Sequence, residues 1–99
     1  MVYEDKGYGI TEKSLKLWHQ HKGDIGKIWL VRARSETPEM PDGYTLIIYG
    51  SKGEIKLSGC NCGYGGTGPN GTRKILEELG MNSEDAYAHM FMKEFDWNL

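Results

Sequence analysis

The sequence predicts an α+β fold, in which a small antiparallel sheet is covered on one face by helices. Three observations predict this class: a β-hairpin pattern at residues 44–57, an apolar strand pattern at 27–34, and amphipathic helical patterns on either side of them. We therefore expect the hairpin plus one or two further strands, one N-terminal helix and two C-terminal helices.

The N-terminal third is expected to hold an extended arm, a helix and a strand. Residues 1–10 place Tyr and Val among charges and glycines, which suits an extended arm or an edge strand. Thr11 can cap a helix whose Leu and Trp side chains share one face, and Gly23 stops it. The segment KIWLVRAR, at 27–34, then predicts a strand.

The middle of the chain predicts a loop and a hairpin. Residues 35–43 contain two prolines and an Asp-Gly pair, which cannot continue a strand ladder. Residues 44–49 are rich in β-branched and aromatic side chains, 50–53 supply a turn, and 54–57 alternate polar with apolar. This is the clearest local pattern in the sequence.

Two helices are expected after the glycine run. The first contains the apolar face of residues 73–79, with Gly80 placed to end it. The second is predicted over 82–99, with Asn82 or Ser83 as its cap and acids in its first turn. Its apolar residues recur at helical spacing: Ala86, Tyr87, Met90, Phe91 and Phe95.

Size, charge and hydropathy restrict the class of protein. A chain of 99 residues, 38% of them hydrophobic, supports a single domain over 1–99. A formal net charge of −2 offers no basic field, so we expect no binding of bulk nucleic acid. No stretch approaches the ~20 apolar residues that span a bilayer, and the N-terminus lacks the apolar segment of a signal peptide. The expectation is a cytoplasmic protein with no membrane contact.

The main candidate for a functional motif is GYGGTGPNGT, residues 63–72. Pro69 is expected as the first helical residue, with Thr67 or Gly68 as the cap, so the glycines precede a helix N-terminus. Free backbone N–H groups and a partial positive charge at such an end favour an anion, most commonly phosphate. The predicted ligand-binding residues are Tyr64, which could stack on a ring, Gly65, Gly66, Thr67, Gly68, Asn70, Thr72, and the cations Arg73 and Lys74.

A purely structural interpretation of this run stays open. It matches neither the Walker A spacing nor the dinucleotide fingerprint. Its glycines Gly63, Gly65, Gly66 and Gly68 could simply hold positive φ at a strand-to-helix corner. In addition, the helical pairs of Arg73 with Glu77 and of Lys74 with Glu78 could offset the cost of cations near a helix N-terminus.

The cysteines and histidines give little support for metal or thiol chemistry. Cys60 and Cys62 are expected to be free thiols that pack in the interior. A zinc site with His19 and His21 would need wider spacing in both pairs. Cys62 has no histidine near it in sequence to act as a base. No catalytic residue, metal ligand or cofactor is therefore predicted.

The loop from Gly63 to Pro69, followed by an apolar-faced helix, a short break and a last helix ending in an aromatic pair such as FDW, resembles an uncharacterised domain family of bacteria and phages. That family carries a Gly-Tyr-Gly-Gly-small-Gly-Pro loop at this place. The resemblance covers about residues 44–97 and implies the order strand, loop, helix, helix and a phage or mobile-element origin, but no activity. The chain departs from the family in its Cys-Asn-Cys segment and its N-terminal helix.

Together these observations predict a non-catalytic binding protein that holds a small phosphate-bearing, nucleotide-like ligand at the glycine run. For a protein of phage origin, one use of such binding is sequestration of a host signalling nucleotide, and analogy with such proteins suggests a homo-oligomer. The alternative is a protein-interaction module, for instance an inhibitor of a host enzyme. In that case the glycine loop is structural and the aromatic last helix meets the host protein.

Overall fold

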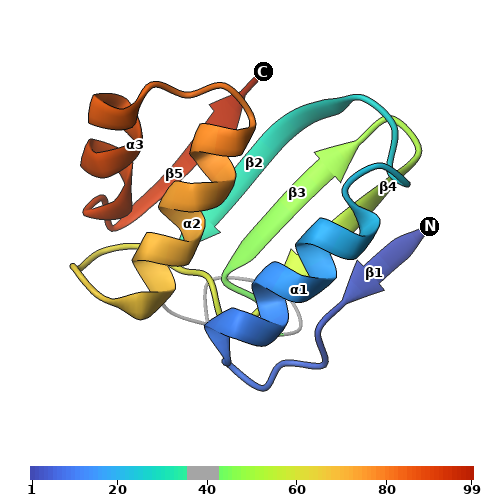
Figure 1. Ribbon diagram of the computed structural model, residues 1–99, viewed down its shortest axis with the longest axis horizontal. Helices are drawn as coiled ribbons and strands as arrows, with labels where there is room; N and C mark the ends of the chain where they lie inside the picture. The colour runs from blue at the N-terminus through green and yellow to red at the C-terminus, as the bar shows by residue number, and fades with distance from the viewer. Residues whose placement is uncertain (36–42) are drawn as a thin grey trace.

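The computed structural model describes residues 1–35 and 43–99 and shows a five-stranded sheet with helices packed on one face (Figure 1). The α+β class, the N-terminal helix and the two C-terminal helices are confirmed. Most of the loop predicted at 35–43 lies outside the described residues. The elements are β1 (Val2–Glu4), α1 (Thr11–His21), β2 (Ile28–Arg34), β3 (Leu46–Gly50), β4 (Gly53–Leu57), α2 (Thr67–Glu78), α3 (Ser83–Met90) and β5 (Glu94–Asn98).

The strand order in the sheet is β1-β4-β3-β2-β5. The predicted hairpin is present as β3 and β4, with Gly50 opposite Gly53 at the turn. Strands β2 and β5 continue the antiparallel pattern, whereas β1 pairs parallel to β4. The sheet is thus mixed, and its two edges come from the two ends of the chain.

The end of the chain is a strand, so the helix predicted across 82–99 is wrong in its second half. Helix α3 ends at Met90, and β5 pairs antiparallel with β2. Phe95 and Trp97 face the core, and the polar residues that alternate with them, Glu94, Asp96 and Asn98, face the other way. Phe95 lies four residues after Phe91, so it fits a helical pattern as well as a strand pattern. The alternation of polar and apolar residues in β5 covers only five residues, which is too short to distinguish a strand from a continuation of the longer helical pattern.

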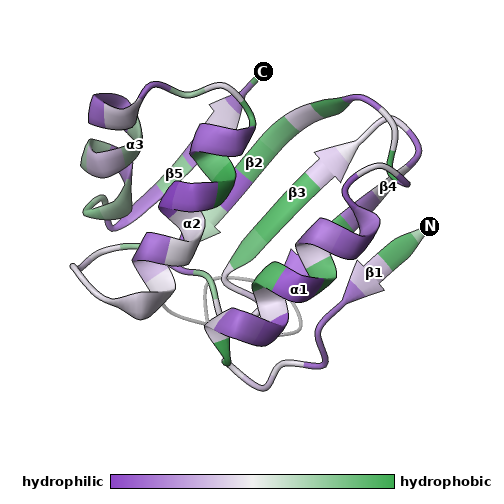
Figure 2. Cartoon of the chain, viewed as in Figure 1, coloured by the Kyte–Doolittle hydropathy of each residue, from purple (hydrophilic) through white to green (hydrophobic). Residues whose placement is uncertain are grey.

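One hydrophobic core lies between the sheet and the helices. Figure 2 shows the apolar strand β3 behind helices that are apolar on one side and polar on the other. Trp18 of α1, Ile75 and Leu76 of α2 and Ala86 of α3 are all buried against the sheet. The strand residues of this core are Val31, Ala33, Leu46, Ile48, Ile55, Leu57 and Phe95.

The first two helices begin at other positions than predicted. Thr11 does not cap α1 but is its first residue, and the N-cap is Ile10. Helix α2 begins at Thr67, so Pro69 is its third residue, and the N-cap is Gly66. Pro is tolerated anywhere in the first turn, because its missing N–H has no partner in the helix.

The start of α3 and the end of α2 agree with the sequence. Asn82 caps α3 by accepting a hydrogen bond from the Asp85 amide at 2.8 Å. Gly80 follows α2 with a φ of 104°, which is the left-handed conformation expected of a C-terminal cap. None of the helices in the described ranges is long and apolar enough to cross a membrane.

Candidate functional site

The N-termini of α1 and α2 meet at one end of the molecule (Figure 1). A Cβ placed on Gly71 would lie 2.7 Å from the Thr11 methyl group and 3.0 Å from the Cys60 sulfur. Any larger side chain at 71 would therefore push the helices apart. The Thr11 hydroxyl donates to the Gly59 carbonyl at 2.6 Å, which ties the start of α1 to the chain leading into α2.

Neither of these two N-termini is capped by a side chain. The first amide bonded within α1 is that of Ser14, which donates to Ile10, and in α2 it is that of Asn70, which donates to Gly66. Each helix end carries a charge equivalent to about +0.5 e. Five amides at these ends make no hydrogen bond within residues 1–35 and 43–99: Thr11, Glu12, Lys13, Thr67 and Gly68.

Two cavities open at this meeting point and share Thr11 and Thr67 as wall residues. The first, of about 630 Å³, lies between the helices and is lined by Thr11, Glu12, Leu15, Gly66, Thr67, Asn70, Gly71 and Lys74. The second, of about 370 Å³, is more polar and is lined by Gly9, Thr11, Ser58, Gly59, Asn61, Tyr64, Thr67 and Gly68. The residues of four of the five free amides, Thr11, Glu12, Thr67 and Gly68, thus line two neighbouring cavities.

The cation on the wall of the first cavity has no acidic partner in the described part of the chain. The helical pair expected between Lys74 and Glu78 does not form, because Glu78 turns to α1 and binds Lys22 and His19 at 3.2 and 3.0 Å. The pair expected between Arg73 and Glu77 does not form either. Lys74 is therefore available to an anion, although Glu12 places an acid on the same wall.

Asn61, on the wall of the second cavity, has a buried polar atom without a partner among the described residues. The Asn61 side-chain oxygen is buried and accepts no hydrogen bond from any described residue, while the Asn61 amide donates to the Tyr64 hydroxyl at 3.4 Å. Gly68 faces Asn61 so closely that a Cβ there would collide with this oxygen. A buried acceptor of this kind is costly unless a donor reaches it.

Six of the nine predicted site residues line the two cavities. Thr67 lines both, Gly66, Asn70 and Lys74 line the first, and Tyr64 and Gly68 line the second. The other three lie outside the walls. Gly65 faces the Phe91 ring, Thr72 is buried and donates to the Asn61 carbonyl at 2.7 Å, and Arg73 borders neither cavity.

The structural role proposed for the four glycines holds at one position only. Gly63 has a φ of 103°, whereas Gly65, Gly66 and Gly68 do not adopt positive φ. Those three need a small residue for another reason, since a Cβ would press on the Phe91 ring, the Tyr64 ring or Asn61. The run is thus both a tight corner and the wall of a cavity.

Sequence reasoning missed the half of the site that α1 and the end of β4 provide. Thr11, Leu15, Ser58, Gly59 and Asn61 border the cavities. The available signals were Gly59 and Gly71, since small residues mark a close approach of two backbones. These glycines do not indicate which segment of the chain packs against them. Only the topology of the fold gives that information.

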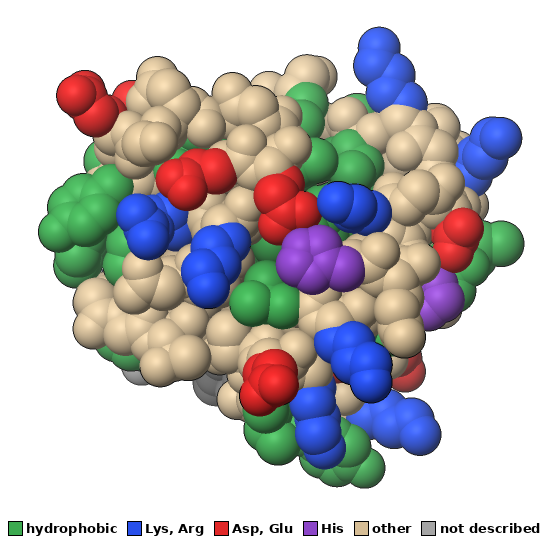
Figure 3. Space-filling model, in the orientation of Figure 1, with side chains coloured by type: hydrophobic (Ala, Val, Ile, Leu, Met, Phe, Trp, Pro, Cys, Tyr) green, Lys and Arg blue, Asp and Glu red, His purple; other side chains and the backbone are tan. Residues whose placement is uncertain are grey.

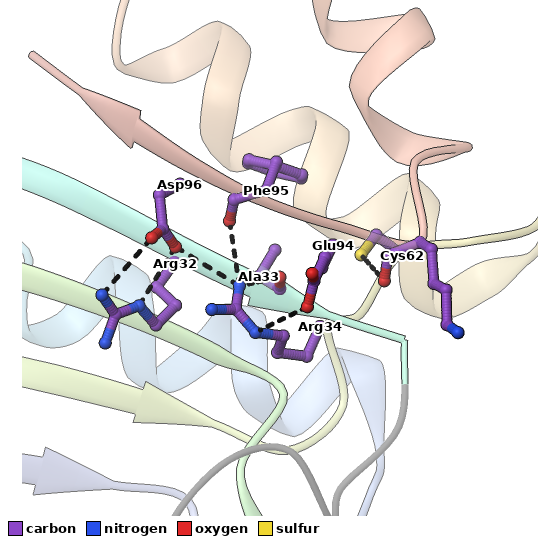
Figure 4. A network of polar contacts seen from close by, with 8 residues as sticks. Arg32, Ala33, Arg34, Cys62, Glu94, Phe95 and Asp96 are labelled. Atoms are coloured by element: carbon purple, nitrogen blue, oxygen red, sulfur yellow. Dashed lines mark hydrogen bonds and ion pairs between the residues drawn. The ribbon is translucent and has the colours of Figure 1, made fainter.

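Both thiols lie in the core and are closed to solvent. Burial, with a smaller contribution from Asp5, raises the pKa of Cys60 to about 12. The Cys62 thiol donates to the Lys93 carbonyl at 3.5 Å (Figure 4). No group of three or more metal-ligating side chains occurs among the described residues, and His19 and His21 bind acids on their own side of the molecule.

A polar network covers the helix-free face of the sheet near β5 (Figure 4). The Arg32 guanidinium binds Asp96 at 3.0 Å, and Arg34 binds both Asp96 and Glu94, at 3.3 and 3.4 Å. The hydrogen bond from Arg32 is the main cause that lowers the pKa of Asp96. Acids and bases on this part of the sheet neutralise one another.

The chain matches no protein-family model, no curated protein and no solved structure.

Proposed function

We propose that this protein is a non-catalytic binding protein for a small, phosphate-bearing, nucleotide-like ligand. The observation that carries the proposal is the meeting of two uncapped helix N-termini at two neighbouring cavities that share Thr11 and Thr67. Free amides and the positive ends of two helix dipoles add at this point, and phosphate is the common biological anion with several acceptor oxygens to meet them. Lys74 adds a full charge nearby.

A ring-bearing ligand fits the rest of the walls better than a bare ion. The first cavity, at about 630 Å³, falls within the usual range of small-molecule sites and has Leu15 as an apolar contact. The second cavity is polar and has Ser58 and Asn61 on its wall, residue types that exchange hydrogen bonds with a nucleobase or a sugar. The ring of Tyr64, half exposed at the second cavity, can stack on a base.

The side chains that line the two cavities favour binding of a ligand without chemical conversion of it. The described residues of these walls contain no histidine or cysteine and one carboxylate, that of Glu12, so no nucleophile and base stand side by side among them. A protein that holds a nucleotide without converting it lowers the free concentration of that nucleotide. Sequestration of a host signalling nucleotide, one use of such binding for a protein of phage origin, is the role we propose.

Thermal unfolding in the presence of linear and cyclic mononucleotides, cyclic dinucleotides and inorganic phosphate tests the proposal. A ligand at a hundred times its Kd adds about 2.7 kcal/mol to stability. In a domain of this size the Tm should rise by roughly 10 °C or more. A panel that gives no shift with any compound would reject the proposal.

Two variant pairs then locate the site. Thr67→Pro deletes one free amide at a helix position that proline favours, whereas Thr67→Ala keeps the amide and removes only the hydroxyl. Lys74→Glu reverses a charge on the cavity wall, and Lys16→Glu makes the same change on the exposed surface of α1.

We expect Thr67→Pro and Lys74→Glu each to weaken binding about tenfold or more and to leave the unfolding of the free protein nearly unchanged. Thr67→Ala and Lys16→Glu should bind almost as the wild type does. If all four variants bind equally well, the ligand lies elsewhere on the molecule.

A further inference from the structure

The outer edge of β5 carries backbone groups that no described strand pairs. Two hydrogen bonds at 3.1 Å fix the pattern: the Leu99 amide donates to the Trp29 carbonyl, and the Ser35 amide donates to the Lys93 carbonyl. In an antiparallel ladder with these bonds, the N–H and C=O groups of alternate residues point to opposite sides. Those of Phe95 and Trp97 face β2, and those of Glu94, Asp96 and Asn98 face away from it.

This edge differs from the other edge of the sheet. Strand β5 is the last in the sheet order and presents five residues, whereas β1, at the opposite edge, has only three. An edge strand with free N–H and C=O groups is a template for one more strand. The outward groups of β5 would accept such a strand without any rearrangement of the sheet.

Apolar side chains flank both ends of this edge. Near its start, Tyr87, Phe91 and Met92 are 55%, 45% and 40% exposed, and the first two rings contact each other at 5.1 Å. Figure 3 shows apolar side chains gathered at the flank of the molecule beside α3. Just beyond the end of β5, Leu99 is 46% exposed.

We propose that two copies of this chain associate through their β5 strands, antiparallel about a two-fold axis at Trp97, and so form one continuous sheet. The two-fold axis brings the start of one β5 beside the end of the other. Leu99 of the second copy then lies opposite Phe95, toward the end of β5 that follows Phe91 and Met92. An apolar surface at both ends of the strand is what such a self-complementary contact requires.

The register follows from the charges. With the axis at Trp97, Asp96 lies opposite Asn98 of the second copy, and Phe95 lies opposite Leu99 of the second copy. An axis at Asp96 would instead place two carboxylates face to face, which destabilises a strand pair. The Asp96 and Glu94 carboxylates are already held by Arg32 and Arg34, so the contact leaves neither acid unpaired.

Sedimentation equilibrium of the wild-type chain over a range of concentrations measures the association. We expect a reversible dimer of twice the 11.2 kDa chain mass. Asn98→Pro deletes an outward N–H that the two-fold contact uses twice, at an edge position where proline is tolerated. It should raise the dimer dissociation constant about tenfold or more, whereas Asn98→Ala, which keeps the N–H, should change it little.

Hydrogen exchange of the wild-type protein identifies the interface directly and does not depend on how the proline variant folds. The Phe95 and Trp97 amides should be protected at every concentration, because they bond to β2. The Asp96 and Asn98 amides should become protected only as the dimer forms. The proposal is overturned by a wild-type chain that stays monomeric up to about 1 mM. It is equally overturned by a dimer whose Asp96 and Asn98 amides exchange freely, or by one that Asn98→Pro leaves intact.

Discussion

The charge of the cavity wall depends on one carboxylate, that of Glu78. From sequence spacing this residue should neutralise Lys74, one turn earlier on the same helix. It turns instead to α1, where Trp18, His19 and Lys22 all bind it. Side-chain pairs within a helix are worth only a few tenths of a kcal/mol, so several partners on a neighbouring helix outweigh one. The sequence could not predict this because the packing of α1 on α2 was not known.

The burial of Cys60 leads to a prediction at the level of a single residue. Both cysteines were expected in the interior, and both are there. With a pKa of about 12, the Cys60 thiol should not react with a thiol-specific reagent at pH 8 while the protein is folded. Labelling followed by mass spectrometry should find neither cysteine modified without denaturant and both modified in it. Rapid labelling of the folded protein would contradict the burial.

The Cys60 thiol makes the stability of the folded protein decrease at alkaline pH. Its folded-state pKa lies above the ordinary value of 9.0, so the folded state holds the proton more tightly than the unfolded state. The stability from this group is complete below about pH 9 and is lost as the pH rises toward 12. A Cys60→Ala variant should lack that part of the alkaline loss.

Among the elements, the strands and helices with long, uninterrupted patterns were predictable. The hairpin of β3 and β4 and the strand β2 lie where β-branched runs and turn residues place them. Strand β5 was not predictable, because its polar–apolar alternation is short and begins only three residues after the end of α3. Pairing with β2 decides its conformation, and such a tertiary contact is not visible in a local pattern.

The contact between α1 and α2 yields a prediction about these two helices. Partial burial acts to raise the pKa of Glu78, but hydrogen bonds from His19, Lys22 and Trp18 together outweigh it, so the pKa lies below its ordinary value of 4.5. The ionised carboxylate therefore stabilises the folded state. We expect Glu78→Gln to lower the free energy of unfolding at pH 7 by about 0.5–1 kcal/mol, a small value because Glu78 is partly exposed.

The pH dependence of that loss distinguishes it from a general defect. A lowered pKa stabilises the protein above the ordinary value of 4.5, and this stability disappears as the pH falls through the folded-state pKa. The difference in the free energy of unfolding between wild type and Glu78→Gln, measured by urea unfolding, should thus vanish at strongly acidic pH. Glu77→Gln, a matched change one residue earlier, should have little effect at either pH. A deficit in Glu78→Gln that is unchanged by acid would contradict this account.

For the whole molecule, the sheet order brings the two halves of the candidate site together. Parallel pairing of β1 with β4 places the start of α1 beside the segment that leads from β4 into α2. The sequence predicted a site at α2 and its glycine run, because those residues are contiguous and are of types that commonly bind anions. It could not reveal that a second helix N-terminus joins them, since that contact spans 48 residues of chain.

The central claim is that the amides of both helix N-termini bind one anionic ligand. A ¹H–¹⁵N correlation titration of the labelled protein tests it most directly, with inorganic phosphate and with the nucleotide that gives the largest thermal shift. The account predicts that the amides of Thr11, Glu12, Thr67 and Gly68 move most, and that all four follow a single dissociation constant. The absence of shifts, or shifts confined to one helix or to the helix-free face of the sheet, would contradict it.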